Sequence, residues 1–226
     1  LTDLRGCRVA AIRPETAGDA AAWRNAFGPI EVAGFGTVRP AWEQGTAGPG
    51  PDGTTIFIEP GVGFGTGLHE TTRLCLAALA AWHREGRPFD RVLDFGSGSG
   101  ILGIAAAVLG AREVDAVEID ANVHGAMHAN AARNGIADRV RVAAALIGVA
   151  AGYDLVVANI TANVLLEHAV ALSAAVRRGH DRLGGGLVLS GLRSDEADRV
   201  AARYGGLLGI VPSRVALGDW HGLRFG

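Results

Sequence analysis

Lysine is absent from this 226-residue sequence, and all 21 basic residues are arginine. Together with 23 acidic residues they give a formal net charge of -2. This balance excludes a bulk electrostatic attraction to nucleic acid or to an anionic membrane surface. Because alanine and glycine are abundant as well, we attribute the missing lysine to genomic base composition and not to the chemistry of the protein.

Cysteine and long apolar runs are also scarce. The two cysteines, Cys7 and Cys75, lie far apart, and Cys75 falls within an apolar helical pattern. This favours buried thiols in a reducing compartment over a disulfide. No apolar run reaches the ~18 residues of a membrane span. The N-terminus has no charged-then-apolar signal pattern. We therefore expect a cytoplasmic protein with no membrane partner.

From residue 92 onward, strand-like and helix-like segments alternate along the chain. The strand-like runs are almost wholly apolar, which is typical of strands covered on both faces. Alternation with helices predicts a doubly wound, mostly parallel α/β sheet. We expect one long helix over 162–179, a helix with Ser194 as its N-cap, and two short strands in the C-terminal tail. The five runs before that tail are RVLDF, EVDAVEI, RVRVAAA, YDLVVANI and GGLVLSGL.

The organisation before residue 53 is weaker. Two strand-like runs, IEVAGFGTVRP and TTIFIEP, are separated by a linker rich in glycine and proline. About 50 residues cannot bury much core alone, so we expect this segment to pack on the rest of the chain. The predicted organisation is an N-terminal segment and linker over 1–52 and a main domain over 53–226.

The stretch VLDFGSGSG places three glycines on a strand-to-helix turn, shortly after an acid. These residues are Asp94, Gly96, Gly98 and Gly100. Glycine lets the backbone adopt positive φ and approach a ligand closely. A carboxylate here would repel a pyrophosphate but would favour a cationic ligand. S-adenosylmethionine carries a sulfonium and an ammonium and has no phosphate, so it suits this turn.

A second acid, Glu118, ends the next strand, 22 positions after Gly96. In doubly wound folds an acid at this place accepts hydrogen bonds from ribose hydroxyls. The alternative is a glycine-rich turn with an unrelated carboxylate that faces solvent. Because both features occur at this spacing, the sequence favours nucleoside binding.

Five segments occur in the order seen in bacterial ribosomal protein methyltransferases, which methylate protein eleven of the large subunit. The chain resembles this family from about Trp23 to the DWHGLRF end, with a shortened N-terminal region. The resemblance implies an S-adenosylmethionine-dependent class I methyltransferase. Its expected fold is a Rossmann-like, mostly parallel seven-stranded sheet with an antiparallel C-terminal strand and a short N-terminal α/β appendage. The segments are FGTGLHETTRLCL, VLDFGSGSGILGIAA, VEIDANVHGAMHANAARNG, YDLVVANITAN and GGLVLSGL.

The resemblance also implies which residues contact the cofactor. The first glycine loop is expected to cover S-adenosylmethionine from the side opposite the second loop. The alternative for this loop is a surface turn before a helix, with Thr71 or Thr72 as helix-start residues. The expected cofactor-binding residues are Phe64, Gly65, Thr66, Thr72, Asp94, Gly96, Gly98, Gly100, Glu118 and Asn159.

Asn159 is the predicted catalytic residue. It lies at the end of the fourth strand, where ligands sit in open α/β sheets. Methyl transfer from a sulfonium needs little acid catalysis, so the enzyme must orient the acceptor lone pair in line. The Asn159 amide oxygen can accept from an amine and aim it. The alternative is that Asn159 caps the following helix, whose start also carries Thr161 and Asn163.

Other chemistries have weaker support. Base-modifying methyltransferases have Asn-Pro-Pro-aromatic where this chain has NITA, so we expect no nucleic-acid substrate. His124 and His128 are spaced four apart but lack a local third ligand, so we expect no metal. Trp220 is interpreted either as a core anchor of the last strands or as part of a substrate wall.

The acceptor is left open between two kinds of amine. Fewer than ~65 residues precede the first glycine loop, too few for a full substrate-recognition domain and its connector. This slightly favours an amine of a small molecule over a protein side chain. The alternatives are a genuine ribosomal protein lysine methyltransferase and a non-catalytic nucleoside-binding domain. A monomer and a homodimer are both left open.

Overall fold

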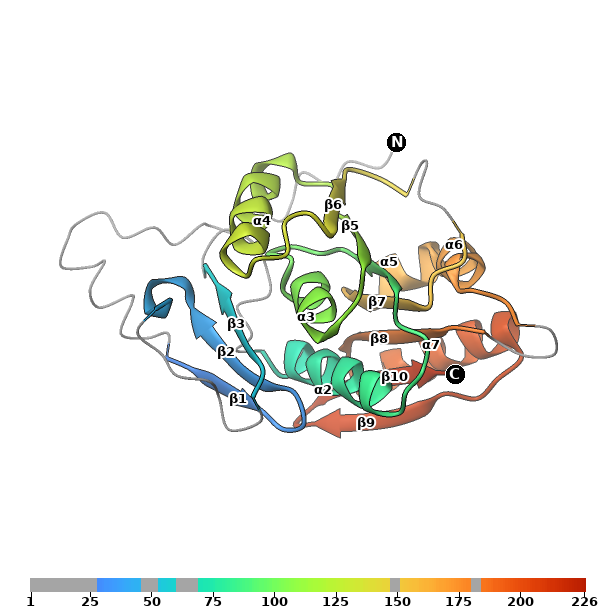
Figure 1. Cartoon of the computed structure of the whole chain (residues 1–226). Helices are drawn as coiled ribbons and strands as arrows, with labels where there is room; N and C mark the ends of the chain where they lie inside the picture. Colours follow the sequence, from blue (N-terminus) through green and yellow to red (C-terminus); the bar gives the residue numbers. More distant parts are fainter. Residues whose placement is uncertain (1–27, 46–52, 60–68, 147–150, 180–183) are drawn as a thin grey trace.

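The main body of the protein is a seven-stranded sheet with strand order β6-β5-β4-β7-β8-β10-β9 (Figure 1). In this computed structural model the strands β4 to β8 are parallel to one another, and β10 is antiparallel to both β8 and β9. The predicted sheet and its antiparallel C-terminal strand are therefore confirmed. The structure describes residues 28–45, 53–59, 69–146, 151–179 and 184–226.

The strands begin and end as follows: β4 (Arg91–Phe95), β5 (Glu113–Val117), β6 (Val140–Ala143), β7 (Leu155–Asn159), β8 (Gly186–Leu192), β9 (Ser213–Leu217) and β10 (Trp220–Phe225).

Helices cover both faces of this sheet, as the apolar strands predict. On one face α2, α3 and α4 pack in a common core with Val92 and Val157. On the other face α5, α6 and α7 pack on Leu93 and Val156, the neighbours of those strand residues. Successive residues of a strand point to opposite faces, so each central strand serves both cores. The helices are α2 (Glu70–Arg84), α3 (Ile101–Leu109), α4 (Ala121–Arg133), α5 (Ala162–Glu167), α6 (Ala169–Ala175) and α7 (Ser194–Leu208).

The long helix predicted over 162–179 is wrong in extent. It is divided at His168, which ends α5 and begins α6. The His168 ring meets Phe95 edge-on at 5.0 Å between ring centroids. The buried Tyr204 hydroxyl donates to the Leu165 carbonyl at 2.8 Å. A continuous helix would offer that carbonyl to the amide four residues later, so these tertiary contacts favour the break.

Two further boundaries differ from the sequence-based expectation. The same predicted helix ends early, because Val176 leaves it to form a parallel bridge with Tyr153. Ser194 is the first residue of α7 and not its N-cap, which is Arg193. The Glu196 carboxylate accepts from the Arg193 backbone N–H at 2.8 Å. This contact satisfies a backbone donor that precedes the helix.

A smaller three-stranded sheet packs beside the first face. Its strands are β1 (Ile30–Val32), β2 (Gly36–Pro40) and β3 (Thr55–Ile58), and a short 3-10 helix η1 (Ala41–Glu43) follows β2. β1 is antiparallel to β2, and β2 is parallel to β3.

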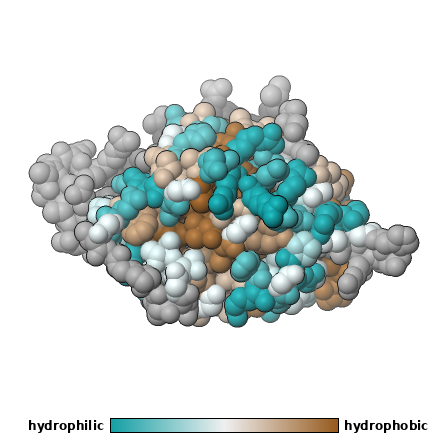
Figure 2. All heavy atoms as spheres, viewed as in Figure 1, coloured by the Kyte–Doolittle hydropathy of each residue, from teal (hydrophilic) through white to brown (hydrophobic). Residues whose placement is uncertain are grey.

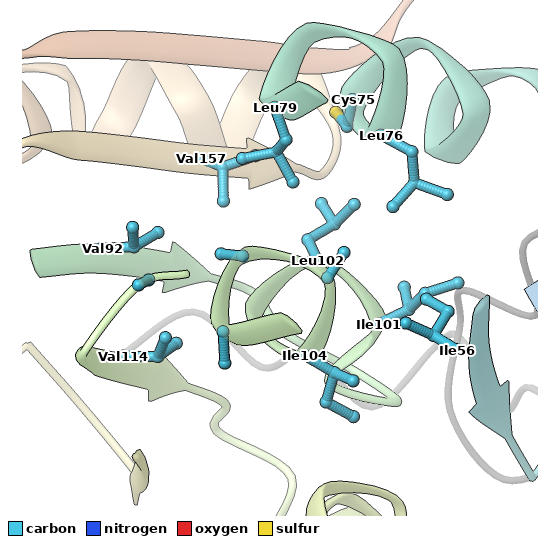
Figure 3. Packing of buried hydrophobic residues seen from close by; sticks show 14 of the residues in the cluster. Ile56, Cys75, Leu76, Leu79, Val92, Ile101, Leu102, Ile104, Val114 and Val157 are labelled. Carbon is cyan, nitrogen blue, oxygen red and sulfur yellow. The ribbon is translucent and has the colours of Figure 1, made fainter. Parts of the chain in front are cut away.

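Contacts with α3 and α4 hold the small sheet in place. Ile56 of β3 is fully buried and lies beside Ile101 of α3 in the core (Figure 3). The Asn134 side chain accepts from the Phe57 amide at 2.8 Å and donates to the Phe57 carbonyl at 2.7 Å. Val32, Phe35 and Val38 are buried in the same core, so the expected packing on the rest of the chain is observed for the described part of the segment before residue 53.

The surface is mixed in polarity. Hydrophobic residues gather near the middle of the face in Figure 2, and hydrophilic residues surround them. Within the part of the chain that the structure describes, no helix combines the length and apolar character needed to cross a membrane.

Candidate active site

The candidate site lies at the carboxyl edge of the large sheet, where β4, β5 and β7 end side by side. Phe95 of β4 is paired with Val117 of β5 and with Ala158 of β7. The residues that follow these positions are Gly96, Glu118 and Asn159, which are far apart in the chain. Parallel pairing therefore brings the glycine turn and both predicted site residues to one edge.

The turn after β4 requires glycine. Gly96, Gly98 and Gly100 have φ of 75°, 52° and 80°. A Cβ on Gly96 would lie 2.4 Å from the Ile160 Cγ2, and a Cβ on Gly100 would lie 2.6 Å from the Met127 Cγ. Both the backbone conformation and the close packing exclude a side chain at these two positions. The turn leads directly into α3, whose N-cap is Gly100.

The carboxylate of Glu118 faces this turn. Its Oε2 accepts from the Gly98 amide at 2.9 Å, and its Oε1 accepts from the Asp120 amide at 3.0 Å. Glu118 therefore connects the glycine turn with the start of α4. A carboxylate has about four acceptor sites, so two remain for hydroxyl donors of a ligand.

Asp94 lies beneath the turn and is 1% exposed. Its Oδ2 accepts from the Gly103 amide in the first turn of α3 at 2.8 Å. Its Oδ1 is buried without a hydrogen-bond partner among the described residues. Burial, with a contribution from the Glu118 charge, raises the pKa of Asp94 to about 7, although the Gly103 hydrogen bond opposes the rise. A cation near this carboxyl would favour its ionised form.

Cys75 of α2 is a free, fully buried thiol, as expected. Burial raises the pKa of the Cys75 thiol far above its usual range, and the Asp94 charge adds to the rise. The thiol therefore stays protonated and has no nucleophilic role.

Asn159 at the end of β7 contacts the first turn of α2. Its Nδ2 donates to the Thr72 Oγ1 at 3.2 Å, which leaves Oδ1 as the acceptor end of the amide. The N-cap of α5 is Thr161, so the helix-cap alternative for Asn159 is wrong. Thr72 is buried, and its hydroxyl positions the amide of a residue on a different element.

The start of α2 is capped by His69, a residue that is not among the predicted cofactor-binding residues. The His69 Nδ1 lies 2.9 Å from the Thr71 Oγ1 and accepts weakly from the Thr71 amide at 3.4 Å. Thr71 and Thr72 belong to the first helical turn, and neither is the N-cap. The other predicted residues of the first loop, Phe64, Gly65 and Thr66, lie outside the described residues.

Two more residues border this edge of the sheet. Trp220 begins β10 and meets the His69 ring edge-on, with 4.7 Å between ring centroids. The Arg193 guanidinium lies over the Trp220 ring, 4.5 Å from its centroid. Trp220 is only half-buried, whereas Leu223 and Phe225 of the same strand are buried. Leu223 and Phe225 therefore anchor this strand in the core, while Trp220 lies at the rim of the site between Arg193 and His69.

The sequence contains some indication that His69 and Arg193 lie near the site. His69 is part of the FGTGLHETT segment, and Arg193 directly follows a predicted strand at its carboxyl end. Their contact through Trp220 was not predictable, because it joins three separate elements.

The two histidines of α4 have separate surroundings. The His124 Nε2 lies 2.7 Å from the Glu118 carbonyl oxygen, and His128 is exposed. No group of three or more ligand side chains suited to a metal occurs among the described residues.

Comparison with known proteins agrees with this geometry. The sequence profile of the family described as Ribosomal protein L11 methyltransferase (PrmA) matches residues 15–225. The chain belongs to this family. The resemblance stated from the five sequence segments is thereby confirmed.

Curated relatives carry the same description. The Ribosomal protein L11 methyltransferase of Cupriavidus necator is 42% identical over 203 residues, which cover 88% of this chain and 62% of the relative. That of Geobacter sulfurreducens is 40% identical over 208 residues, which cover 91% of this chain and 65% of the relative. The chain thus spans less than two thirds of the length of these relatives.

Solved structures support the fold assignment. The ribosomal protein L11 methylase of Lactobacillus delbrueckii subsp. bulgaricus superposes with a TM-score of 0.75 at 28% identity, covering 88% of this chain and 98% of that one. A putative RNA methyltransferase of Pyrococcus horikoshii has a TM-score of 0.53 at 17% identity, with coverages of 70% and 83%. The second likeness concerns the fold alone. The predicted class I methyltransferase fold is confirmed.

Proposed function

We propose that this protein transfers a methyl group from S-adenosylmethionine to an amine nitrogen of a protein, with ribosomal protein L11 as the acceptor. The observation that carries the proposal is the meeting of Asp94, the glycine turn, Glu118 and Asn159 at one carboxyl edge of the sheet. Membership of the L11 methyltransferase family supports the same activity.

The residues at this edge fit S-adenosylmethionine. The unpartnered Asp94 oxygen suits a cationic ligand, and the side-chain-free turn leaves backbone exposed to it. Glu118 retains acceptor sites for the two ribose hydroxyls. Thr72, Gly96, Gly98, Gly100 and Asn159 complete the proposed cofactor set within the described residues. When bound, this cofactor supplies an electrophilic methyl group on its sulfonium.

Asn159 is the proposed catalytic residue, since it can orient the acceptor. Its Nδ2 is already engaged with Thr72, so Oδ1 faces away from that contact and can accept an N–H of the amine. A fixed acceptor oxygen holds the nitrogen in one orientation and leaves its lone pair free for in-line attack. Orientation of this kind can supply ~7–11 kcal/mol of barrier reduction.

A protein acceptor is favoured by the relatives, which are described as acting on ribosomal protein L11. The length argument had slightly favoured a small-molecule amine. We retain the proposed organisation of a short segment over 1–52 and a methyltransferase domain over 53–226, with β1 and β2 in the first part. N-methyl transfer, with an amine in the acceptor protein, is the finer part of the proposal.

The test is transfer of labelled methyl from S-adenosylmethionine into purified ribosomal protein L11. The full chain is expected to label the protein, and Asn159→Ala is expected to label it far more slowly while still binding cofactor. Label that enters only a small-molecule extract of the source cell would overturn the acceptor. Cofactor binding without transfer to either would instead support a non-catalytic nucleoside-binding domain.

A further inference from the structure

Arg193 is an exposed arginine on the rim of the candidate site. It directly follows β8, whose Ser190 is paired with Asn159 of β7. Arg193 and Asn159 therefore lie at the same edge of the sheet, on neighbouring strands. The Arg193 backbone is fixed, because its N–H donates to the Glu196 carboxylate at 2.8 Å.

The Arg193 side chain is stacked and still accessible. Its guanidinium lies over the face of Trp220, 4.5 Å from the ring centroid. One guanidinium nitrogen of Arg193 donates to the Asp219 carboxylate at 2.9 Å. The Arg193 side chain is 51% exposed and the Asp219 side chain is 83% exposed. Stacking holds the plane of a guanidinium but leaves its N–H edge directed outward.

Arg214, a nearby arginine, has a purely structural role and serves as a comparison. Arg214 donates to the Asp198 carboxylate, to the Ser194 carbonyl and hydroxyl, and to the His221 ring. These contacts attach β9 to the start of α7 and use most of its donors. Arg193, by contrast, has one carboxylate partner among the described residues, Asp219, and the Asp219 side chain is 83% exposed. Exposed ion pairs of this kind contribute little to stability, so Asp219 can be exchanged for another carboxylate.

We propose that Arg193 is a specificity-determining residue that binds a carboxylate of the acceptor beside the amine to be methylated. This inference rests on the proposed methyl-transfer function. Arginine suits the task because its planar fork can hold a carboxylate through two parallel hydrogen bonds. It does not suit the amine itself, since a guanidinium repels an ammonium. Arg193 therefore recognises an acidic group that lies next to the amine on the acceptor.

Contacts connect Arg193 with the residue proposed to orient the amine. Trp220 lies between Arg193 and His69, with 4.7 Å between the Trp220 and His69 ring centroids. His69 caps α2, whose Thr72 accepts from Asn159. An acceptor carboxylate bound to Arg193 would therefore lie on the same side of the site as Asn159, which is proposed to orient the amine.

The experiment measures methylation of purified ribosomal protein L11 by Arg193→Met, Arg193→Lys and the wild type. Arg193→Met keeps the alkyl stem over Trp220 and removes the charge. We expect it to raise the acceptor KM by about tenfold or more, with kcat and cofactor affinity changed less than about twofold. Arg193→Lys, which keeps the charge and loses the fork, is expected to fall between the two.

Two matched variants separate recognition from structure. Arg199→Met removes the charge of another exposed arginine, in the middle of α7, and it is expected to leave the acceptor KM unchanged. Asp219→Asn removes the competing carboxylate, so the acceptor KM is expected to stay equal or to fall. If Asp219→Asn raises the KM as much as Arg193→Met does, the pair is structural and the inference is overturned.

The acceptor side gives an independent readout. Replacing acidic residues near the methylated amine of L11 by their amides should raise KM for the wild type but not further for Arg193→Met. Additive losses would overturn the inference. A wild-type enzyme that leaves L11 unmethylated would instead defeat the proposed function, so the two failures are distinguishable.

Discussion

The side-chain amide of Asn159 donates to the hydroxyl of Thr72 at 3.2 Å, across 87 positions of sequence. Thr72 belongs to α2, which follows the first glycine-rich segment, and Asn159 ends β7. The contact joins the two sequence segments that the family resemblance had connected only by their order. It also fixes which end of the Asn159 amide is free to accept a hydrogen bond.

Asn159→Ala should reduce turnover by about 100-fold while cofactor affinity changes little, because loss of orientation affects the reacting geometry and not the bound nucleoside. Single-turnover rates and calorimetric cofactor titration on the same preparation measure the two effects. Thr72→Val removes the hydroxyl that holds the Asn159 amide, and it should reduce turnover by a smaller factor. A near-normal rate for Asn159→Ala with L11 would remove the residue from the catalytic role.

Glu118→Ala should weaken S-adenosylmethionine binding by about 10- to 100-fold, since loss of a charged acceptor typically costs ~1.5–3 kcal/mol. Isothermal titration calorimetry gives the affinity. Glu113→Ala is the matched control, because Glu113 is an exposed acid at the opposite end of the same strand. Equal affinity for the folded Glu118→Ala variant and the wild type would exclude Glu118 from the cofactor site.

Asp94 should make cofactor binding depend on pH. Its pKa is raised from 3.8 to about 7, chiefly by burial. Since the cofactor is cationic, its affinity should increase as pH rises through about 7 and Asp94 ionises. Asp94→Asn is isosteric and should bind weakly with a flat profile. A wild-type affinity that is constant between about pH 6 and pH 8 would contradict this linkage.

The same group affects stability with a defined sign. The folded-state pKa of Asp94 lies above its unfolded value, so the folded protein binds the extra proton. Its contribution to stability is fully present below about pH 3.8 and is lost as pH rises to about 7. Urea unfolding should therefore show Asp94→Asn gaining stability relative to the wild type between about pH 5 and pH 8. A constant difference between the two proteins would argue against an ionisation in this range.

Gly96→Ala should destabilise the protein by about 2–4 kcal/mol, because alanine is strained at positive φ and its Cβ would overlap Ile160. Gly125→Ala is the control. A Cβ on Gly125 of α4 would meet nothing within 4 Å, so this change should stabilise the helix by roughly 0.5–1 kcal/mol. Denaturant unfolding of both variants measures the difference, and similar values for the two would refute the packing argument.

Local patterns in the chain were sufficient to predict the sheet and much of the candidate site. Apolar runs such as YDLVVANI must be covered on both faces, and their alternation with helical segments implies parallel strands. A ligand-binding site could be predicted from VLDFGSGSG and Glu118, because a glycine turn with positive φ and the end of a strand are both local features of the sequence. These predictions depend on residues that are close together in sequence.

Contacts between distant elements could not be read from those patterns. The division of α5 from α6 depends on Tyr204 and Phe95, which belong to other elements. Their contacts oppose the local tendency of this segment to form one continuous helix. Arg193 and His69 both contact Trp220 because the end of β8 and the starts of β10 and α2 meet at one edge of the sheet. Side-chain packing of this kind depends on how the chain returns to the same place in space, and hydrophobic periodicity along a single element does not encode it.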